Sequence, residues 1–179
     1  MTEQPDNAQP GTEPPGTGSL GRIETMALGI VVERRRGVTA WADWSWRPVS
    51  VIPGAGPVDP PGTVLMQGDG WTHRHAATLA MELFRTDTEG YRLNLSQDPP
   101  RLWVVMRPGP DGEELVPFAV TASAHEGEGY QIGADVVETV PMPPEVIALV
   151  RDFVEQHHVD VPFHKRERKR HFEKEGQRR

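Results

Sequence analysis

Apolar and polar residues alternate over several stretches of this chain, which is the pattern of a half-buried β-strand. The stretch MALGIVVERRR, residues 26–36, has an apolar side chain at every second position from Met26 to Val32 and ends in three arginines. The stretch WRPVSVIPG, residues 46–54, predicts a second strand, with Trp46 and Pro48 on one face and Val51 on the other. Because proline cannot donate to a ladder of hydrogen bonds, this strand is expected at a sheet edge or a bulge.

Two further pairs of stretches are expected to form β-hairpins. HRHAATLAMELFR, residues 73–85, is joined by the turn sequence DTEG to YRLNLS, residues 91–96. RLWVVMR, residues 101–107, is joined by a segment containing Asp-Gly to LVPFAVTAS, residues 115–123. DVVETVPM, residues 135–142, predicts one more short strand. The Pro- and Gly-rich residues 55–70 are expected to form a long loop, and residues 123–131 one helical turn.

A clear helical period occurs in PPEVIALVRDFVEQHH, where apolar residues recur at spacings of three and four from Val146 to Val154. This predicts a helix over residues 144–158, with Pro144 in its first turn. Its apolar stripe needs a sheet to cover. The predicted fold is therefore mainly β (α+β), with about seven mostly antiparallel strands in a barrel or sandwich capped by one C-terminal helix. In element order it is similar to pleckstrin-homology-like barrels.

Composition divides the chain into three parts. Residues 1–25 contain four Pro and four Gly and are expected to be disordered, since they offer little apolar surface to bury. Residues 26–163 are expected to form a single globular domain. Residues 164–179 hold eight Lys or Arg against three Glu, so this basic tail carries a net charge of +5 and the other 163 residues carry −12. An acidic body would repel a phosphate backbone, which argues against nucleic acid as the partner.

Several classes of function lack the residues they need. The chain contains no cysteine, which excludes disulfides, thiolate metal sites and cysteine nucleophiles. No glycine-rich stretch has the strand-before, helix-after context of a phosphate loop, and no Ser lies in a nucleophile elbow. There is also no apolar run of the roughly 18–20 residues that a membrane span needs. We therefore expect a cytoplasmic protein without catalytic residues and without a cofactor.

His73 and His75 are the candidate metal ligands. On a strand they share one face, where both imidazoles could reach one ion, and the spacing is similar to the His-x-His of the cupin signature. The sequence departs from that signature, because Glu82 comes too late and no second half of the motif follows. A pair of histidines without metal is the favoured interpretation. A small-molecule or metal-binding β-barrel that uses His73, His75 and Glu82 stays open as an alternative.

The stretch WADWSWRP brings three of the five tryptophans together and follows the arginines at 34–36. One or two of these rings are expected in the core, with Trp41 at the surface. Arginine side chains could stack on the rings, as they do at many binding hot spots. The predicted partner-binding residues are those of this stretch and of the basic tail: Trp41, Trp44, Trp46, Arg47, Lys165, Arg166, Arg168, Lys169 and Arg170.

From Leu28 onward the chain resembles a bacterial family known only as domain of unknown function 3305. The resemblance is carried by LGIVVERRRGVTAWADWSWRPVSVIPG, TLAMELFRTDTEGYRLNLSQDPPRLWVVMR, PFAVTASAHEG and MPPEVIALVRDFVEQHHVDVPFHKRERKR, and covers residues 26–170. Its members are usually encoded beside molybdenum-dependent formate dehydrogenase genes. The resemblance therefore implies a role in assembling, maturing or regulating such an enzyme. The implied partners are a formate dehydrogenase subunit or its maturation proteins.

Three hypotheses follow from the sequence. The first is a non-enzymatic accessory factor for a molybdenum-dependent formate dehydrogenase, acting by protein–protein binding. The second is the metal- or small-molecule-binding barrel already described. The third is a binder of nucleotides or nucleic acid through tryptophan stacking and the basic tail.

Overall fold

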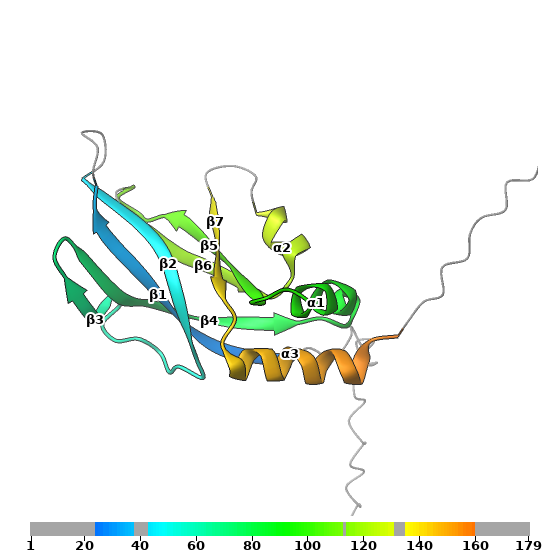
Figure 1. Ribbon diagram of the computed structural model, residues 1–179. Coiled ribbons are helices and arrows are strands. Elements are labelled where there is room, and N and C mark those ends of the chain that lie inside the picture. The colour runs from blue at the N-terminus through cyan, green and yellow to red at the C-terminus, as the bar shows by residue number, and fades with distance from the viewer. Residues whose placement is uncertain (1–23, 38–42, 113, 131–134, 160–179) are drawn as a thin grey trace, which may run out of the picture.

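The computed structural model describes residues 24–37, 43–112, 114–130 and 135–159, which form two antiparallel sheets and three α-helices (Figure 1). The predicted disordered segment covers residues 1–25; residues 1–23 and the basic tail fall outside the described residues, whereas Glu24 and Thr25 lie in the first strand and correct the end of that segment. The elements are β1 Glu24–Arg36, β2 Trp44–Pro53, β3 Thr63–Gly68, β4 Trp71–Leu83, a 3-10 helix Arg85–Asp87, α1 Thr88–Leu95, β5 Arg101–Pro108, β6 Leu115–Thr121, α2 Ala124–Gly129, β7 Val136–Pro141 and α3 Pro144–His157.

The larger sheet has the strand order β2-β1-β4-β3 and is built around the predicted first strand. Leu28, Ile30 and Val32 of β1 are buried, as the alternation of the sequence predicts. β2 is an edge strand with an irregular register beside Pro48, which confirms the role predicted for that proline. The irregularity also corrects one prediction. Val49 has no partner in β1, so Val51 is shifted to the buried face together with Pro48.

The predicted loop at residues 55–70 contains a strand that the sequence analysis missed. β3 pairs antiparallel with β4, and residues 68–71 turn the chain between them, with Gly70 at a φ of +72° that glycine adopts readily. The run of Val64, Leu65 and Met66 is apolar, but its three side chains are exposed. Because no face of this strand is buried, its residues lack the alternation that marks a strand in sequence.

The predicted strand at residues 91–96 is wrong, because these residues belong to helix α1. Strand alternation would place Tyr91 and Leu93 on one face, but Tyr91 is fully buried whereas Leu93 is 65% exposed. The buried positions are Thr88, Tyr91 and Asn94, which recur at the spacing of a helix. β4 therefore forms its hairpin with β3, which precedes it.

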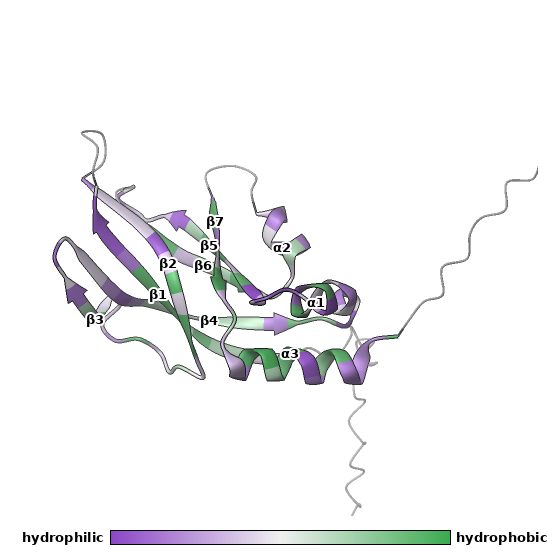
Figure 2. Ribbon diagram, viewed as in Figure 1, coloured by the Kyte–Doolittle hydropathy of each residue, from purple (hydrophilic) through white to green (hydrophobic). Residues whose placement is uncertain are grey.

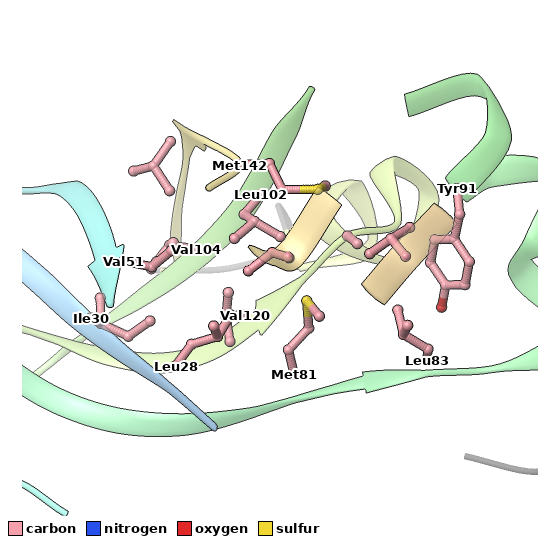
Figure 3. Close-up of a cluster of buried hydrophobic side chains, with 14 of the residues drawn as sticks. Leu28, Ile30, Val51, Met81, Leu83, Tyr91, Leu102, Val104, Val120 and Met142 are labelled. Carbon is pink, nitrogen blue, oxygen red and sulfur yellow. The ribbon is translucent and has the colours of Figure 1, made fainter. Parts of the chain in front are cut away.

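The smaller sheet has the order β6-β5-β7, and its strands match the predictions for residues 101–107, 115–123 and 135–142. The short α2 and the long α3 are also confirmed, and α3 begins at Pro144 as expected. Side chains of both sheets and of α1 and α3 form one core (Figure 3). Its largest fully buried members include Tyr91, Phe153, Leu28, Ile30, Met81, Leu83, Leu102 and Met106.

The two sheets face each other across this core, with β4 beside β6 and β2 beside β7. No ladder of hydrogen bonds joins the sheets among the residues described, so the arrangement is a sandwich and not a closed barrel. The comparison with pleckstrin-homology barrels stays a prediction. Figure 2 shows hydrophobic residues along α3 and the adjoining ends of the strands, and hydrophilic residues at the far end of β1. The end of the sandwich away from α3 is therefore polar.

Candidate binding groove between the two sheets

The polar end of the sandwich carries two arginines and two tryptophans on the inner face of the larger sheet. The alternation that buries Val32 continues along β1 and brings Arg34 to the same face, paired with Trp46 of β2. On the other side of β1, the irregular register near Ala76 of β4 brings Arg74 to this face as well. The core thus gives way to cationic and aromatic side chains where the sheets separate.

A cavity of about 230 Å³ lies between these side chains and the turn that joins β5 to β6. Its neighbour of about 260 Å³ shares Trp46, Arg74, Glu114 and Val116 with it and continues toward Pro61 and Gly62. Together they form one groove open to solvent, which we call the binding groove. One wall is formed by Arg34, Trp44, Trp46 and Arg74, and the other by Gly109, Pro110, Asp111, Glu114 and Val116.

Arg34 is held against both indole rings of the binding groove. Its guanidinium carbon Cζ lies 3.6 Å from the ring centroid of Trp44 and 5.4 Å from that of Trp46. A cation over the face of tryptophan contributes about 0.5–1 kcal/mol at an exposed site. Trp44 is 40% exposed, so its ring is available to a ligand, whereas Trp46 packs against the core.

Three N–H donors on this wall are buried without an acceptor among the residues described: Nε of Arg34, Nε of Arg74 and Nε1 of Trp46. Such a donor costs about 1–3 kcal/mol while it has no partner. The described part of the chain also provides no carboxylate within ion-pair distance of Arg34 or Arg74. Asp111 and Glu114 lie on the opposite wall and are exposed. The groove therefore offers buried donors and two cations to an acceptor from outside.

Behind the groove, the outer face of the same sheet has the opposite character, because Glu33 is paired there with Arg35 and Arg47. The buried carboxylate of Glu33 accepts from Nε and an Nη of Arg35 at 3.1 and 3.0 Å, and from Nε of Arg47 at 2.9 Å. Nε2 of His73 lies 3.3 Å from the same carboxylate. The hydrogen bonds from Arg35, followed by those from Arg47 and His73, lower the pKa of Glu33 to about 2 against the opposing effect of burial.

The two candidate metal ligands share the outer face, as predicted, but their ring nitrogens contact other groups. His73 contacts Glu33 and packs its ring against Trp71, with centroids 4.6 Å apart. Nε2 of His75 lies 3.0 Å from the hydroxyl of Thr78. Glu82 lies seven residues beyond His75 on β4, a distance of about 23 Å along an extended strand. Among the described residues, no three His, Asp or Glu side chains come together as a metal site.

The predicted partner-binding residues are thus divided between two faces. Trp44 and Trp46 line the binding groove, whereas Arg47 lies on the outer face and is engaged by Glu33. The contact of Arg34 with the rings follows the predicted stacking of arginine on tryptophan. Trp41 and the basic residues Lys165, Arg166, Arg168, Lys169 and Arg170 lie outside the described residues.

Arg74 and the β5–β6 turn were not predicted to be parts of the groove. Arg74 follows His73 in a strand whose face changes at an irregular register, and sequence periodicity does not reveal such a change. The turn reaches the groove only through the packing of one sheet on the other. The one sequence feature that indicated the groove was the alternation of β1, which continues from Val32 to Arg34.

Comparisons with known proteins add a family but no function. Residues 27–167 match a family described as "Protein of unknown function (DUF3305)". No curated protein and no solved structure matches the chain. Within the described residues, no helix has the length and apolar character needed to cross a membrane.

Proposed function

The chain belongs to the DUF3305 family, and we propose that it is a non-enzymatic accessory factor that acts by binding another protein through the binding groove. The enzyme we propose as its target is a cytoplasmic, molybdenum-dependent formate dehydrogenase, whose assembly, maturation or regulation the factor would assist. Its direct partner would be a subunit of that enzyme or one of its maturation proteins. The choice of enzyme is supported by the resemblance to a bacterial family encoded beside formate dehydrogenase genes.

The observation that carries a binding function is the set of unpaired groups in the groove. Arg34 and Arg74 have no carboxylate partner among the described residues, although the chain outside its basic tail has a net charge of −12. The exposed ring of Trp44 adds apolar surface next to them. Arginine and tryptophan are enriched among the residues that dominate binding energies at protein interfaces. A partner that supplies acceptors would offset the cost of the buried donors.

The test is a pull-down with the tagged full chain from its native host grown on formate, with bound proteins identified by mass spectrometry. We expect formate dehydrogenase subunits or maturation proteins with the unchanged chain. Recovery should fall at least severalfold for Trp44→Ala and for a chain that ends at Phe163. Arg151→Gln is the control, since Arg151 is exposed on α3, away from the groove. If neither the parent chain nor any variant recovers these proteins, the proposed enzyme is wrong.

A further inference from the structure

We infer that the binding groove takes the carboxylate of an isolated Asp or Glu side chain from the partner protein, seated between Arg34, Arg74 and the indole N–H of Trp46. This inference rests on the proposed function only in taking the occupant to be a segment of a protein. It concerns the chemistry of the occupant and not the identity of the enzyme.

On the wall formed by the larger sheet, the side chains of Arg34, Arg74 and Trp46 present hydrogen-bond donors. The buried Nε atoms of Arg34 and Arg74 and the buried Nε1 of Trp46 all lack acceptors among the described residues, and all three residues line the same cavity of about 230 Å³. Arg34 of β1 pairs with Thr72 of β4, and Arg74 of β4 pairs with Val32 of β1. The two arginines therefore lie diagonally across the β1–β4 ladder. A ligand that satisfies this wall must bring at least two acceptor atoms. A cation or an apolar group would leave the donors unsatisfied.

A carboxylate fits these donors better than other acceptors do. The guanidinium group presents Nε–H and a terminal N–H as a planar fork, which matches the two oxygens of a carboxylate. Charge-assisted hydrogen bonds of this kind are roughly twice as strong as neutral ones. A neutral amide has one acceptor oxygen and would serve the fork only in part. Asp and Glu side chains are therefore favoured over Asn and Gln.

The opposite wall limits how much negative charge can enter. Asp111 and Glu114 balance Arg34 and Arg74, so the ionisable groups that line the first cavity within the described part of the chain have a formal net charge of zero. The rim carboxylates repel any anion, but a single carboxylate can lie against the arginines, whereas the second charge of a phosphate dianion or the neighbouring charges of an acidic run would lie nearer the rim and be repelled more. The groove is thus suited to one carboxylate flanked by apolar residues, which can pack against the exposed ring of Trp44.

The experiment is an NMR titration of the full ¹⁵N-labelled chain, followed through the indole N–H signal of Trp46, which Trp46→Phe identifies. The probe is the blocked peptide acetyl-Ser-Leu-Glu-Leu-Ser-amide. The same peptide with Gln in place of Glu is the uncharged control. We expect a saturable downfield shift with the Glu peptide and at least about tenfold weaker binding of the Gln peptide, since a charged hydrogen-bonded pair is lost.

Variants locate the effect in the groove. Arg34→Gln combined with Arg74→Gln should weaken binding of the Glu peptide by about tenfold or more, and Arg151→Gln should leave it within about twofold. Thermal unfolding of each variant shows whether it is folded. If the double variant does not fold, Arg74→Lys serves in its place, because it keeps the charge and loses the fork. It should bind the Glu peptide more weakly than the parent chain does.

Three results would overturn the inference: equal shifts with the Glu and Gln peptides, unchanged binding by folded groove variants, or stronger competition from inorganic phosphate than from acetate at equal concentration. Failure of the proposed function has a different signature. If the Glu peptide binds as expected but no formate dehydrogenase protein is recovered, only the enzyme is wrong. If those proteins are recovered and Trp44→Ala weakens their recovery, but the Glu and Gln peptides bind equally, only the carboxylate site is wrong.

Discussion

At the residue scale, Glu33 is the buried ionised group on which the outer face of the larger sheet depends. Its carboxylate is almost fully buried, and it is surrounded by Arg35, Arg47 and His73, two of which come from neighbouring strands. These contacts join β1 to β2 and β4 at the end of the sheet that also forms the groove. We therefore expect the Glu33 cluster to support the groove from behind.

The low pKa of Glu33 predicts how stability depends on pH. Because the pKa falls from 4.5 to about 2 on folding, the carboxylate stabilises the fold above about pH 4.5, and this contribution is lost as the pH falls toward 2. Since Arg35 and Arg47 are half exposed, we expect Glu33→Gln to cost about 1–3 kcal/mol at pH 7. Urea unfolding at several pH values should show the difference shrinking between pH 5 and 2. A difference that is constant with pH would contradict this role.

Two glycines of α2 offer a matched pair at the same scale. A Cβ added to Gly127 would lie 2.5 Å from Cγ of Trp103, whereas a Cβ at Gly129 has nothing within 4 Å. Gly127→Ala should therefore destabilise the protein by about 1–3 kcal/mol through overpacking. Gly129→Ala should be neutral or slightly stabilising, because alanine favours helix more than glycine does. Thermal unfolding of the two variants compares them directly, and equal melting temperatures would contradict the close packing of Trp103.

At the element scale, the polar side chain of Asn94 attaches α1 to the smaller sheet. The Nδ2 group of Asn94 donates to the carbonyls of Arg101 and Ala122, both at 2.8 Å, and its Oδ1 accepts from the backbone N–H of Arg101 at 3.0 Å. These hydrogen bonds satisfy backbone groups at the start of β5 and just after β6. They complement the apolar contact between Tyr91 of α1 and Phe153 of α3.

Asn94→Ala should lower the free energy of unfolding by about 2–4 kcal/mol, because it leaves buried backbone groups without partners. Leu93→Ala in the same helix is the control. Its side chain is 65% exposed, so we expect a change within about 0.5 kcal/mol. Urea denaturation of both variants measures the contrast. Since alanine favours helix at least as well as either residue, a loss in Leu93→Ala as large as that in Asn94→Ala would contradict the role given to the hydrogen bonds of Asn94.

Comparing individual elements shows where prediction from the sequence succeeded and where it did not. Strong alternation with one buried face, as in β1, and a sustained helical period, as in α3, were predictable because burial imposes the pattern. α1 was mistaken for a strand because two of its buried positions, Thr88 and Asn94, are polar and do not register as part of an apolar stripe. β3 was missed because neither of its faces is buried. The irregular register that brings Arg74 into the groove depends on pairing between strands, which periodicity does not contain.

At the scale of the whole molecule, the sandwich has two unlike ends. Helices α1 and α3 pack onto the core at one end, where the buried apolar side chains gather (Figures 1 and 3). At the other end the sheets enclose the binding groove, with arginines and tryptophans on one wall and exposed carboxylates on the other. The apolar core thus lies mainly away from the proposed binding site, so groove substitutions at Trp44 or Arg74 should change binding more than they change folding.

The central claim is that the groove binds a protein of the formate dehydrogenase system. The most direct measurement is the dissociation constant between the purified full chain and the enzyme subunit or maturation protein that it recovers, for the parent chain, the Arg34→Gln and Arg74→Gln double variant, and Arg151→Gln. The account predicts binding that is at least about tenfold weaker in the double variant and unchanged in the control. Equal dissociation constants for all three folded proteins would contradict it.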